Sequence, residues 1–447
     1  MLEELFKLKQ RKTNVSTEIL AGITTFISMS YVLSLTPAIL SKTGVNPGAL
    51  FTATALSAIT ATLLMAFLAN QPIAVAPSCI INTFIVAVIV LRMGHSWQFA
   101  LTAIAIESIL FTLLIYFNLR EAIINTIPKN LLLAITCGLG FFLIFFGLAN
   151  LQIIKIPDEI LSVHLYRIQP LIFEHFAILP IISIIIGVTI GAALMSKKVK
   201  GAIILSAICT ALIGIPFGIT KIPVDFSCFK APPSIAPILC SFQVKEIFSS
   251  DLVLVVLSLL FLDLFNVVGT LAGITPKAGL LKREDHRDGI RQALLACSLG
   301  SFIGSILGAS IVSPYIESAA GMMEGGKTGL TALTTATMFG IALFFYPVIS
   351  LIPATAIVVT IILTGLYLMR SFKYIDFDDY SEYIPSLLTI ITIPLLCNIA
   401  AGIIIGTVSY VLLKLATGKA KQLDIVLVIL AILYCISLAF FKTNMLV

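Results

Sequence analysis

Four acidic side chains stand in apolar stretches of this chain, where a charge is costly and is usually retained for a function. They are Glu18, at the edge of its stretch, and Glu107, Asp263 and Glu317. Glu317 follows Pro314 in ASIVSPYIESAAGM (309–322), and we expect it in the first turn of a short helix. The helix dipole there favours the anion, whereas burial favours the protonated acid. This carboxylate is predicted to bind a ligand and exchange a proton; capping backbone amides is the structural alternative.

A second group of polar side chains lies in FLDLFNVVGTLAGITP (261–276). Asp263 precedes Asn266 by one helical turn, so the two side chains share a helix face. We expect this face to border a ligand site. For Asp263, a hydrogen bond that only joins neighbouring helices is as well supported as a place in the ligand site.

Pro77 and Pro314 each interrupt an apolar stretch. Proline lacks an amide hydrogen and disfavours helix in the residue before it, so 73–76 and 309–313 are predicted to be extended, each followed by a short helix. Extended backbone inside a bilayer needs protein or water as partner, so we expect the two segments to pair. Asn82, one turn into the first short helix, is predicted to bond a ligand or the opposite backbone. Both helix N-termini then point at the membrane midplane.

The intervals between these features repeat along the chain. Thr36-Pro37 and Thr275-Pro276 each close an apolar stretch, and 239 positions separate the two threonines. The two interrupting prolines, Pro77 and Pro314, are 237 positions apart. These matching intervals predict two homologous halves of about seven spans, inverted relative to each other. Interrupted segments at matching places of inverted repeats are typical of transporters.

The composition indicates what holds these residues in place. Of 447 residues, 59% are hydrophobic and 11% are charged, whereas a soluble domain has about 25% charged residues. We predict an all-α polytopic membrane protein with fourteen transmembrane spans. The spans are expected at 17–41, 49–69, 72–91, 97–117, 130–149, 176–196, 201–220, 252–274, 291–309, 311–320, 328–349, 352–369, 383–397 and 399–415. A further run, 423–441, is either a crossing or a helix lying along the bilayer.

Basic residues predict the orientation of the chain. A polar segment containing Lys7, Lys9, Arg11 and Lys12 precedes the first apolar run, which is too long for a cleavable signal peptide. With the N-terminus in the cytoplasm, most of the 28 Lys and Arg residues fall at cytoplasmic ends, as the positive-inside rule requires. Contact with the lipid bilayer then explains the net charge of +6 without nucleic acid as a partner. We expect a multi-pass protein of the inner cell membrane.

Enzyme and metal motifs are missing from the sequence. It has no HExxH, no GxSxG and no complete phosphate loop, and EGGKTG (324–329) indicates a tight cytoplasmic turn. The eight cysteines show no CxxC or CxxH spacing, so neither a metal nor a cofactor is expected. Cys228 and Cys240, in a predicted external loop, are either two free thiols or a disulfide. A transporter is therefore expected rather than an enzyme.

Six stretches of the sequence are more specific. They are EILAGITTFISMSYVLSLTPAIL (18–40), PIAVAPSCIINTF (72–84), MGHSWQFAL (93–101), REAIINTIPKNLLLAITCGLG (120–140), FLDLFNVVGTLAGIT (261–275) and SPYIESAAGMMEGGKTGLTAL (313–333). Together they resemble the AzgA-type purine permeases of the nucleobase:cation symporter family, over nearly the whole chain. The resemblance implies a seven-plus-seven inverted repeat with a core domain (spans 1–4 and 8–11) and a gate domain (spans 5–7 and 12–14). It also implies proton-driven uptake of hypoxanthine, guanine or adenine.

The resemblance carries over to single positions. Glu317 matches the acid that hydrogen-bonds the nucleobase, with backbone from Tyr315 and Ile316 nearby. Asn82 matches the polar residue of the third span, and Thr270 matches a polar position one turn after the ligand residue of the eighth span. That ligand position is held here by Asn266, which we expect to face the other edge of the base.

Four positions depart from the family pattern. The usual family pattern in the eighth span is DLFDTxGTL, which has an acid where this chain has Asn266. An amide can donate and accept hydrogen bonds but cannot take up a proton. Either Asp263 or Glu107, which replaces a small hydroxyl residue, is therefore expected to share the proton coupling with Glu317. A lone acid facing a polar gap is the alternative for Glu107. Ser78 and Ile80 replace glycines and narrow the approach to the first short helix.

Five segments follow from these predictions. They are a cytoplasmic N-terminus (1–15), a first repeat (16–220), an external loop (221–250), a second repeat (251–416) and a C-terminal hydrophobic segment (417–447). The expected function is import of a purine nucleobase by proton symport, with alternating access between core and gate. The alternative is a carrier of the same fold for another nucleobase or an inorganic anion, since fold does not fix function. The sequence leaves open which base is transported, whether protons or sodium ions drive uptake, and whether the protein forms a homodimer.

Overall fold

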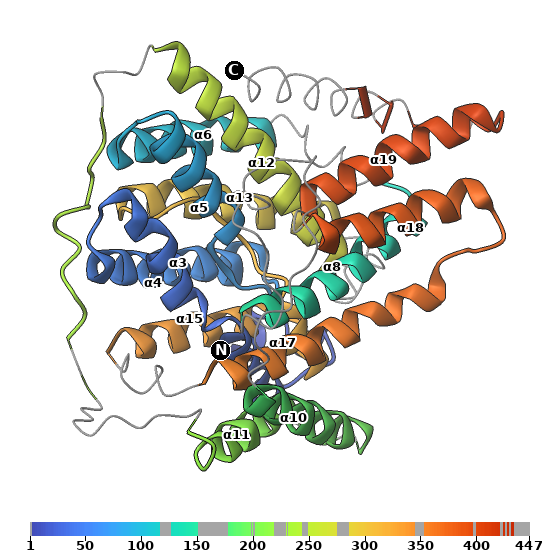
Figure 1. Cartoon of the computed structure of the whole chain (residues 1–447), viewed down its shortest axis with the longest axis horizontal. Helices are drawn as coiled ribbons and strands as arrows, with labels where there is room; N and C mark the ends of the chain where they lie inside the picture. Colours follow the sequence, from blue (N-terminus) through green and yellow to red (C-terminus); the bar gives the residue numbers. More distant parts are fainter. Residues whose placement is uncertain are drawn as a thin grey trace.

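The computed structural model shows a chain built almost entirely of helices (Figure 1). It describes residues 2–116, 127–150, 178–197, 199, 202–218, 229, 231–243, 249–274, 286–344, 353–396, 399–420, 423–424, 427–428 and 431–432. The first half contains α1 (Leu2–Leu5), α2 (Val15–Met29), α3 (Val32–Leu40), α4 (Pro47–Leu64), β1 (Val75–Pro77), α5 (Cys79–Phe84), α6 (Trp97–Tyr116), α8 (Lys129–Asn150), α10 (Ile178–Ser196) and α11 (Ala202–Gly214). The second half contains α12 (Ser250–Ile274), α13 (His286–Ile306), β2 (Val312–Pro314), α14 (Ser318–Met323), α15 (Gly329–Phe344), α17 (Ala354–Met369), α18 (Tyr380–Leu395) and α19 (Ile399–Ala416).

Apolar helices lie at several of the predicted spans. Within the described residues, seven are long and apolar enough to cross a membrane: Val15–Thr43, Pro47–Ala69, Trp97–Tyr116, Lys129–Leu148, Leu179–Ser196, Gly289–Ile306 and Ala354–Tyr374. Shorter apolar helices cover Ile81–Arg92, Ala202–Gly214, Gly329–Phe344 and Ala401–Ala416. The membrane class is therefore supported, whereas the count of fourteen crossings stays a prediction.

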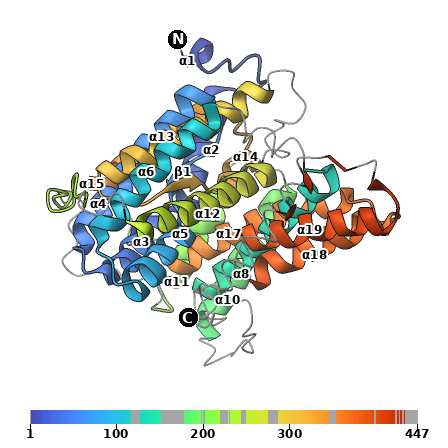
Figure 2. The ribbon, with the colours of Figure 1, turned by 90° about the horizontal axis from the view of Figure 1, so that it is seen from above.

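The helices pack in two groups that lie on opposite sides of the molecule (Figure 1, Figure 2). One group contains α2, α3, α4, α6, α12, α13 and α15, and the other contains α8, α10, α11, α17, α18 and α19. Helices from both halves of the chain mix in each group. The first group comes from the spans assigned to the core and the second from those assigned to the gate. The groups meet where α12 packs on α8 and α19, and where α14 packs on α17.

Backbone contact fixes α8 against α17 in the second group. A Cβ atom on Gly140 would lie 2.6 Å from the carbonyl oxygen of Gly365, and a Cβ on Gly365 would lie 2.6 Å from that of Gly140. No larger residue fits at either position without displacing backbone. Small residues at such crossings let membrane helices approach closely.

The two extended segments pair as the sequence predicts. β1 and β2 are antiparallel, with Val75 opposite Pro314 and Pro77 opposite Val312. The ladder continues past both ends: Tyr315 N–H donates to the Ala74 carbonyl (2.9 Å), and Ser78 N–H donates to the Ile311 carbonyl (3.0 Å). This pairing satisfies backbone groups that a bilayer could not.

Side-chain hydroxyls satisfy the outer edges of the two strands. Thr62 Oγ1 accepts from Val75 N–H (3.0 Å) and donates to the Val75 carbonyl (2.9 Å). Ser301 Oγ does the same for Val312, at 3.0 and 3.3 Å. Thr62 and Ser301 are 239 positions apart, as are the two threonines of the predicted repeat. Neither strand thus presents an open edge, the feature that makes isolated strands prone to mispairing.

Glu18 has a structural role in this fold. Its carboxylate accepts from Lys327 N–H (3.0 Å), Thr328 N–H (3.2 Å) and the Thr331 hydroxyl (2.6 Å), at the start of α15. Backbone amides at a helix start are otherwise without partners, and an anion there is favoured by the helix dipole. The EGGKTG stretch is the turn that presents these amides to Glu18, in agreement with the turn expected there.

The predicted cytoplasmic N-terminus is packed against the first helix group. Phe6 and Leu8 are buried with Ala66 of the segment that continues α4 and with Leu330 of α15. The Asn70 side chain donates to the Phe6 carbonyl (3.2 Å). These contacts tie residues 2–13 to the helices beside them.

The external loop and the C-terminal segment are described only in part. Thr52 donates to the Pro233 carbonyl (2.7 Å), and Cys240 N–H donates to the Ile306 carbonyl (2.8 Å), so the described part of the loop packs over α4 and α13. Cys240 is an exposed free thiol, and Cys228 lies outside the described residues. Thr275-Pro276 and most of 417–447 also lie outside them.

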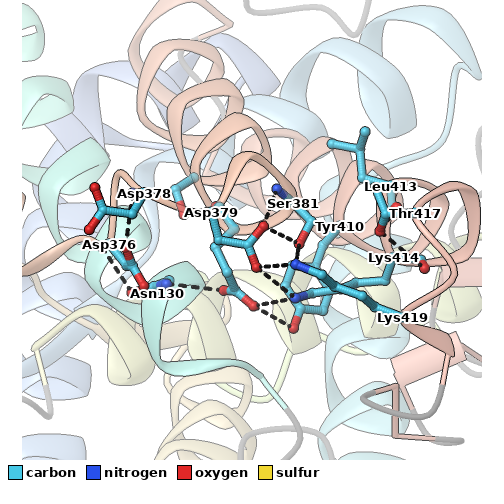
Figure 3. Close-up of polar contacts among 12 residues, drawn as sticks. Asn130, Asp376, Asp378, Asp379, Ser381, Tyr410, Leu413, Lys414, Thr417 and Lys419 are labelled. Atoms are coloured by element: carbon cyan, nitrogen blue, oxygen red, sulfur yellow. Dashed lines mark hydrogen bonds and ion pairs between the residues drawn. The ribbon is translucent and has the colours of Figure 1, made fainter.

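A charged cluster joins the ends of α8, α18 and α19 (Figure 3). Lys414 of α19 is 1% exposed, and its Nζ lies 2.8 Å from Glu382 and 3.8 Å from Asp379. Glu382 also accepts from the Tyr410 hydroxyl and the Asn130 amide, each at 3.1 Å. These contacts compensate the buried ammonium group of Lys414 and the partly buried carboxylate of Glu382, which would otherwise be destabilising.

Asp379 gives this cluster a pH dependence. It lies in the turn before α18, where hydrogen bonds from Lys419 (2.6 Å) and from the Ser381 hydroxyl and amide (2.8 and 2.9 Å) hold its pKa well below the ordinary value. A lowered folded-state pKa stabilises the fold above the unfolded pKa, about 4, and this contribution is lost as pH falls through the folded pKa.

We predict that the thermal midpoint of wild type exceeds that of Asp379→Asn by a constant margin from pH 7 to about 5. The margin should shrink steadily below about pH 4, and thermal unfolding in detergent across this range would measure it. A margin independent of pH would contradict the assignment.

Candidate functional site

Glu317 lies where α14 begins, next to the paired strands. The helix starts at Ser318, so Glu317 is its N-cap residue, and the expectation that Glu317 lies in the first turn of a helix starting near Pro314 is wrong. The physical reason is the strand pairing, which extends through Pro314 and includes Tyr315 N–H. The side chain makes no capping bond to its own helix. It is 3% exposed and is therefore directed to partners elsewhere.

Tyr31 is the partner of that carboxylate. Its hydroxyl donates to Glu317 Oε1 at 2.5 Å, across 286 positions of sequence. Tyr31 stands at the break between α2 and α3, and its ring lies 5.6 Å from the ring of Phe146 on α8. Glu317 and Tyr31 thus lie where the first helix group meets the second. The phenol thus holds one carboxylate oxygen, Oε1.

Tyr315 and Ile316 form the wall beside Glu317. The Tyr315 hydroxyl donates to the Pro77 carbonyl (2.7 Å) and contacts Cys79 Sγ (3.7 Å), which locks β2 to the start of α5. Ile316 is buried in the same apolar cluster as Val267 of α12. These side chains hold the two strand ends and α12 in one place.

Asn266 faces this region from α12. Its Nδ2 donates to Ser78 Oγ at 3.1 Å, and both side chains are buried. Asp263 and Thr270 lie three residues before and four residues after Asn266 on the same helix, and both are buried as well. The predicted shared face of α12 is therefore turned into the protein, and Asn266 reaches the start of α5.

Asn82 and Glu107 occupy other surroundings. Asn82 accepts a short hydrogen bond from the Ser310 hydroxyl and donates to Thr36 Oγ1 (3.4 Å), so it links α5 to the opposite extended segment. Glu107 is fully buried on α6, with the hydroxyl of Ser108 3.5 Å from Oε2. Ligand contact for Asn82 and proton coupling for Glu107 stay predictions.

Two residues of the site, Tyr31 and Ser78, were not predicted in the roles that the structure gives them. Tyr31 was not singled out, although a tyrosine in the middle of an apolar span needs a partner for its hydroxyl. Ser78 was noted only for its size, and the structure adds its bond to Asn266. Among the described residues, no three His, Cys, Asp or Glu side chains are placed to hold a metal ion.

The sequence model of the Permease family matches residues 16–405 of this chain. The chain belongs to this permease family. The permease is a multi-pass membrane transporter and not an enzyme, as its relatives and its apolar helices indicate.

Curated relatives cover nearly all of the permease. A putative permease of Methanocaldococcus jannaschii is 36% identical over 97% of both chains. The adenine permease AdeP of Escherichia coli is 33% identical over 99% of this chain and 97% of its own. The guanine/hypoxanthine permease PbuO of Bacillus subtilis is 34% identical over 97% of this chain and 99% of its own.

Solved structures share the fold of the permease at low identity. The transmembrane domain of the cyanobacterial bicarbonate transporter BicA superimposes with a TM-score of 0.53 and 13% identity, over 87% of this chain and 96% of that one. The murine anion transporter Slc26a9 in its inward-facing state gives 0.53 and 12% identity, over 90% of this chain and 68% of that one. At such identities the likeness concerns the fold alone.

Proposed function

We propose that this permease imports a purine nucleobase across the inner cell membrane by proton symport. The observation that carries the proposal is the carboxylate of Glu317, buried at the start of an interrupted helix, with one oxygen held by Tyr31 at the junction of the two helix groups. Ionisable groups within a membrane are usually functional. Relatives of similar identity are named adenine permease and guanine/hypoxanthine permease, which supports a purine base as the solute.

The chemistry of a nucleobase fits this site. A purine is planar, apolar on its faces and polar at its rim, so it needs a few directed hydrogen bonds in a mostly apolar cleft. Adenine, guanine and hypoxanthine each carry an imidazole N–H, which a carboxylate oxygen accepts in a charge-assisted bond. Glu317 Oε2 is assigned this bond, and Phe146 and Tyr31 provide aromatic faces beside it.

Proton coupling is assigned to acids of the first helix group. Glu317 is the first candidate because its protonation would remove the charge that strengthens its hydrogen bond to the N–H of the base, and so would release the base. Asp263 and Glu107 are buried acids on helices of the same group and are the two further candidates. Asn266 cannot take this role, because an amide does not carry a proton.

Alternating access is assigned to motion of the first helix group against the second. Three pairs of residues at 239-residue spacing support an inverted repeat: Thr36 with Thr275, Thr62 with Ser301, and Ser78 with Glu317. The second pair satisfies the outer edges of the two strands, and the third pair occupies the N-cap positions of the two short helices. Transporters built of inverted repeats place their solute between such interrupted segments.

Transport of an inorganic anion is the second candidate. The solved structures of similar fold include a bicarbonate transporter and an anion transporter. A buried carboxylate in the site opposes an anion, because like charges at short range in a low dielectric repel strongly. Glu317 therefore favours the nucleobase.

Uptake measurements test the proposal. Cells that lack their own carriers would express the permease and receive radiolabelled hypoxanthine, guanine, adenine, xanthine or uracil, with and without a protonophore. We expect uptake of at least one purine, and the protonophore should reduce it to background. Absence of uptake by well-inserted protein would show that the fold carries another solute, and uptake that requires sodium but resists the protonophore would replace the coupling ion.

A further inference from the structure

Tyr31 touches both helix groups with one side chain. It stands at the break between α2 and α3 in the first group, and its hydroxyl donates to Glu317 Oε1 at 2.5 Å. Its ring lies 5.6 Å from the ring of Phe146, which belongs to α8 of the second group. The phenol that holds the carboxylate is therefore itself placed against a helix of the other group.

The surroundings of Glu317 give this bond its weight. The carboxylate is 3% exposed and makes no capping bond to α14. In the part of the chain that the structure describes, two other titratable side chains face it, Tyr315 beside β2 and Cys79 in the first turn of α5. The Tyr315 hydroxyl donates to the Pro77 carbonyl, and Cys79 contacts that hydroxyl. Of the three, Tyr31 is the one that donates to the carboxylate.

The bond from Tyr31 favours the charged form of the acid. An ionised carboxylate that is shielded from water is disfavoured unless hydrogen-bond donors compensate its charge. A bond from a phenol to an ionised carboxylate is charge-assisted and about twice as strong as a bond between neutral groups. Tyr31 therefore stabilises ionised Glu317 more than it stabilises the protonated acid.

We infer that Tyr31 is a positioning residue that couples the ionisation of Glu317 to the contact between the two helix groups. This inference rests on the proposed function, in which ionised Glu317 accepts the N–H of the base. While the ring of Tyr31 packs on Phe146, its hydroxyl is held at the carboxylate and Glu317 stays ionised. Movement of the second group away from the first removes this support, weakens the bond and favours transfer of a proton from water to Glu317.

Binding of a purine across a range of pH tests the inference. Full-length permease in detergent would receive radiolabelled hypoxanthine, guanine or adenine, whichever wild type takes up. Affinity should fall as Glu317 is protonated, and in Tyr31→Phe the midpoint of this fall should lie about one to two pH units higher than in wild type. At alkaline pH, where both proteins have an ionised Glu317, their affinities should agree within about threefold. A loss of packing alone would instead lower the affinity at every pH.

Two further variants are matched comparisons. Tyr410→Phe also removes a phenol that donates to a carboxylate, the bond of 3.1 Å to Glu382, but it does so in the charged cluster of α8, α18 and α19. It should leave the midpoint unchanged. Glu317→Gln removes the group that titrates, so its affinity should be low and independent of pH.

Phe146 separates the coupling between groups from the local effect of the hydroxyl. Phe146→Ala removes the ring against which Tyr31 packs and should raise the midpoint by up to about one pH unit, the size of one aromatic pair. Added to Tyr31→Phe, it should cause no further shift, because no hydroxyl is left to be positioned.

Four outcomes would overturn the inference. They are a midpoint that Tyr31→Phe does not move, a midpoint that Phe146→Ala does not move, a further shift by Phe146→Ala in the Tyr31→Phe background, and a pH dependence that persists in Glu317→Gln. Purine binding and uptake by wild type in the presence of any of these outcomes leave the proposed function standing. Absence of both binding and uptake in wild type removes the proposed function and the inference together.

Discussion

Replacement of Glu317 by glutamine should lower purine uptake by about ten- to hundredfold. The variant keeps the shape of the side chain, and Tyr31 can still donate to its amide oxygen at the place of Oε1. The amide nitrogen that replaces the other oxygen donates, however, and so faces the N–H of the base with a second donor. Loss of a charge-assisted bond costs about 1.5 to 3 kcal/mol, which corresponds to that change in affinity. Initial rates of radiolabelled uptake over a range of purine concentrations would measure it.

Proton coupling should fail in the same variant. Glutamine cannot take up a proton, so any uptake that remains should no longer respond to a protonophore. The matched control is Glu324→Gln, because Glu324 is the C-cap residue of the same short helix and lies at its other end. The control should transport at the wild-type rate. Full uptake and full protonophore sensitivity in Glu317→Gln would remove Glu317 from both the binding and the coupling role.

Replacement of Lys414 by methionine should destabilise the second helix group by up to about 3 to 5 kcal/mol, the usual cost of removing one partner of a fully buried ion pair. Lys414 is 1% exposed and lies 2.8 Å from Glu382, so its loss leaves a partly buried carboxylate with neutral donors alone. Methionine has a similar length and fills the space, so the loss concerns the charge rather than the packing. Thermal unfolding in detergent would measure the change, with a dye that becomes fluorescent when it reacts with thiols exposed on unfolding.

Two comparisons separate the pair from its surroundings. Lys419 contacts Asp379 at 2.6 Å but is 38% exposed, and Lys419→Met should cost at most about 1 kcal/mol because solvent screens exposed pairs. Combining Lys414→Met with Glu382→Met removes both charges and should recover most of the lost stability. Equal effects of Lys414→Met and Lys419→Met, or no recovery in the double variant, would contradict a buried pair that acts as a unit.

The class of the protein could be predicted from composition and local rules. Apolar stretches of span length indicate membrane helices, because every backbone group in a bilayer needs a hydrogen-bond partner within its own segment or its neighbours. The restricted backbone at Pro77 and Pro314 marked the two interrupted segments and led to their pairing, which the structure confirms. Buried acids could be found by the same reasoning, since charges are rare in such stretches. Belonging to a permease family, expected from six sequence stretches, is confirmed by the family match.

The partners of the polar side chains were decided by tertiary structure alone. Tyr31 meets Glu317 across 286 positions, Asn266 meets Ser78 across 188, and Glu18 caps a helix that starts more than 300 positions away. Local periodicity gives the face of a helix on which a residue lies, but not which helix comes to lie against that face. The start of α14 shows the same limit, because proline rules place it near Pro314 while the bond from Tyr315 N–H to Ala74 delays it to Ser318. The sequence by itself therefore determined which residues had to find partners in the membrane, and packing of distant helices decided which partners they found.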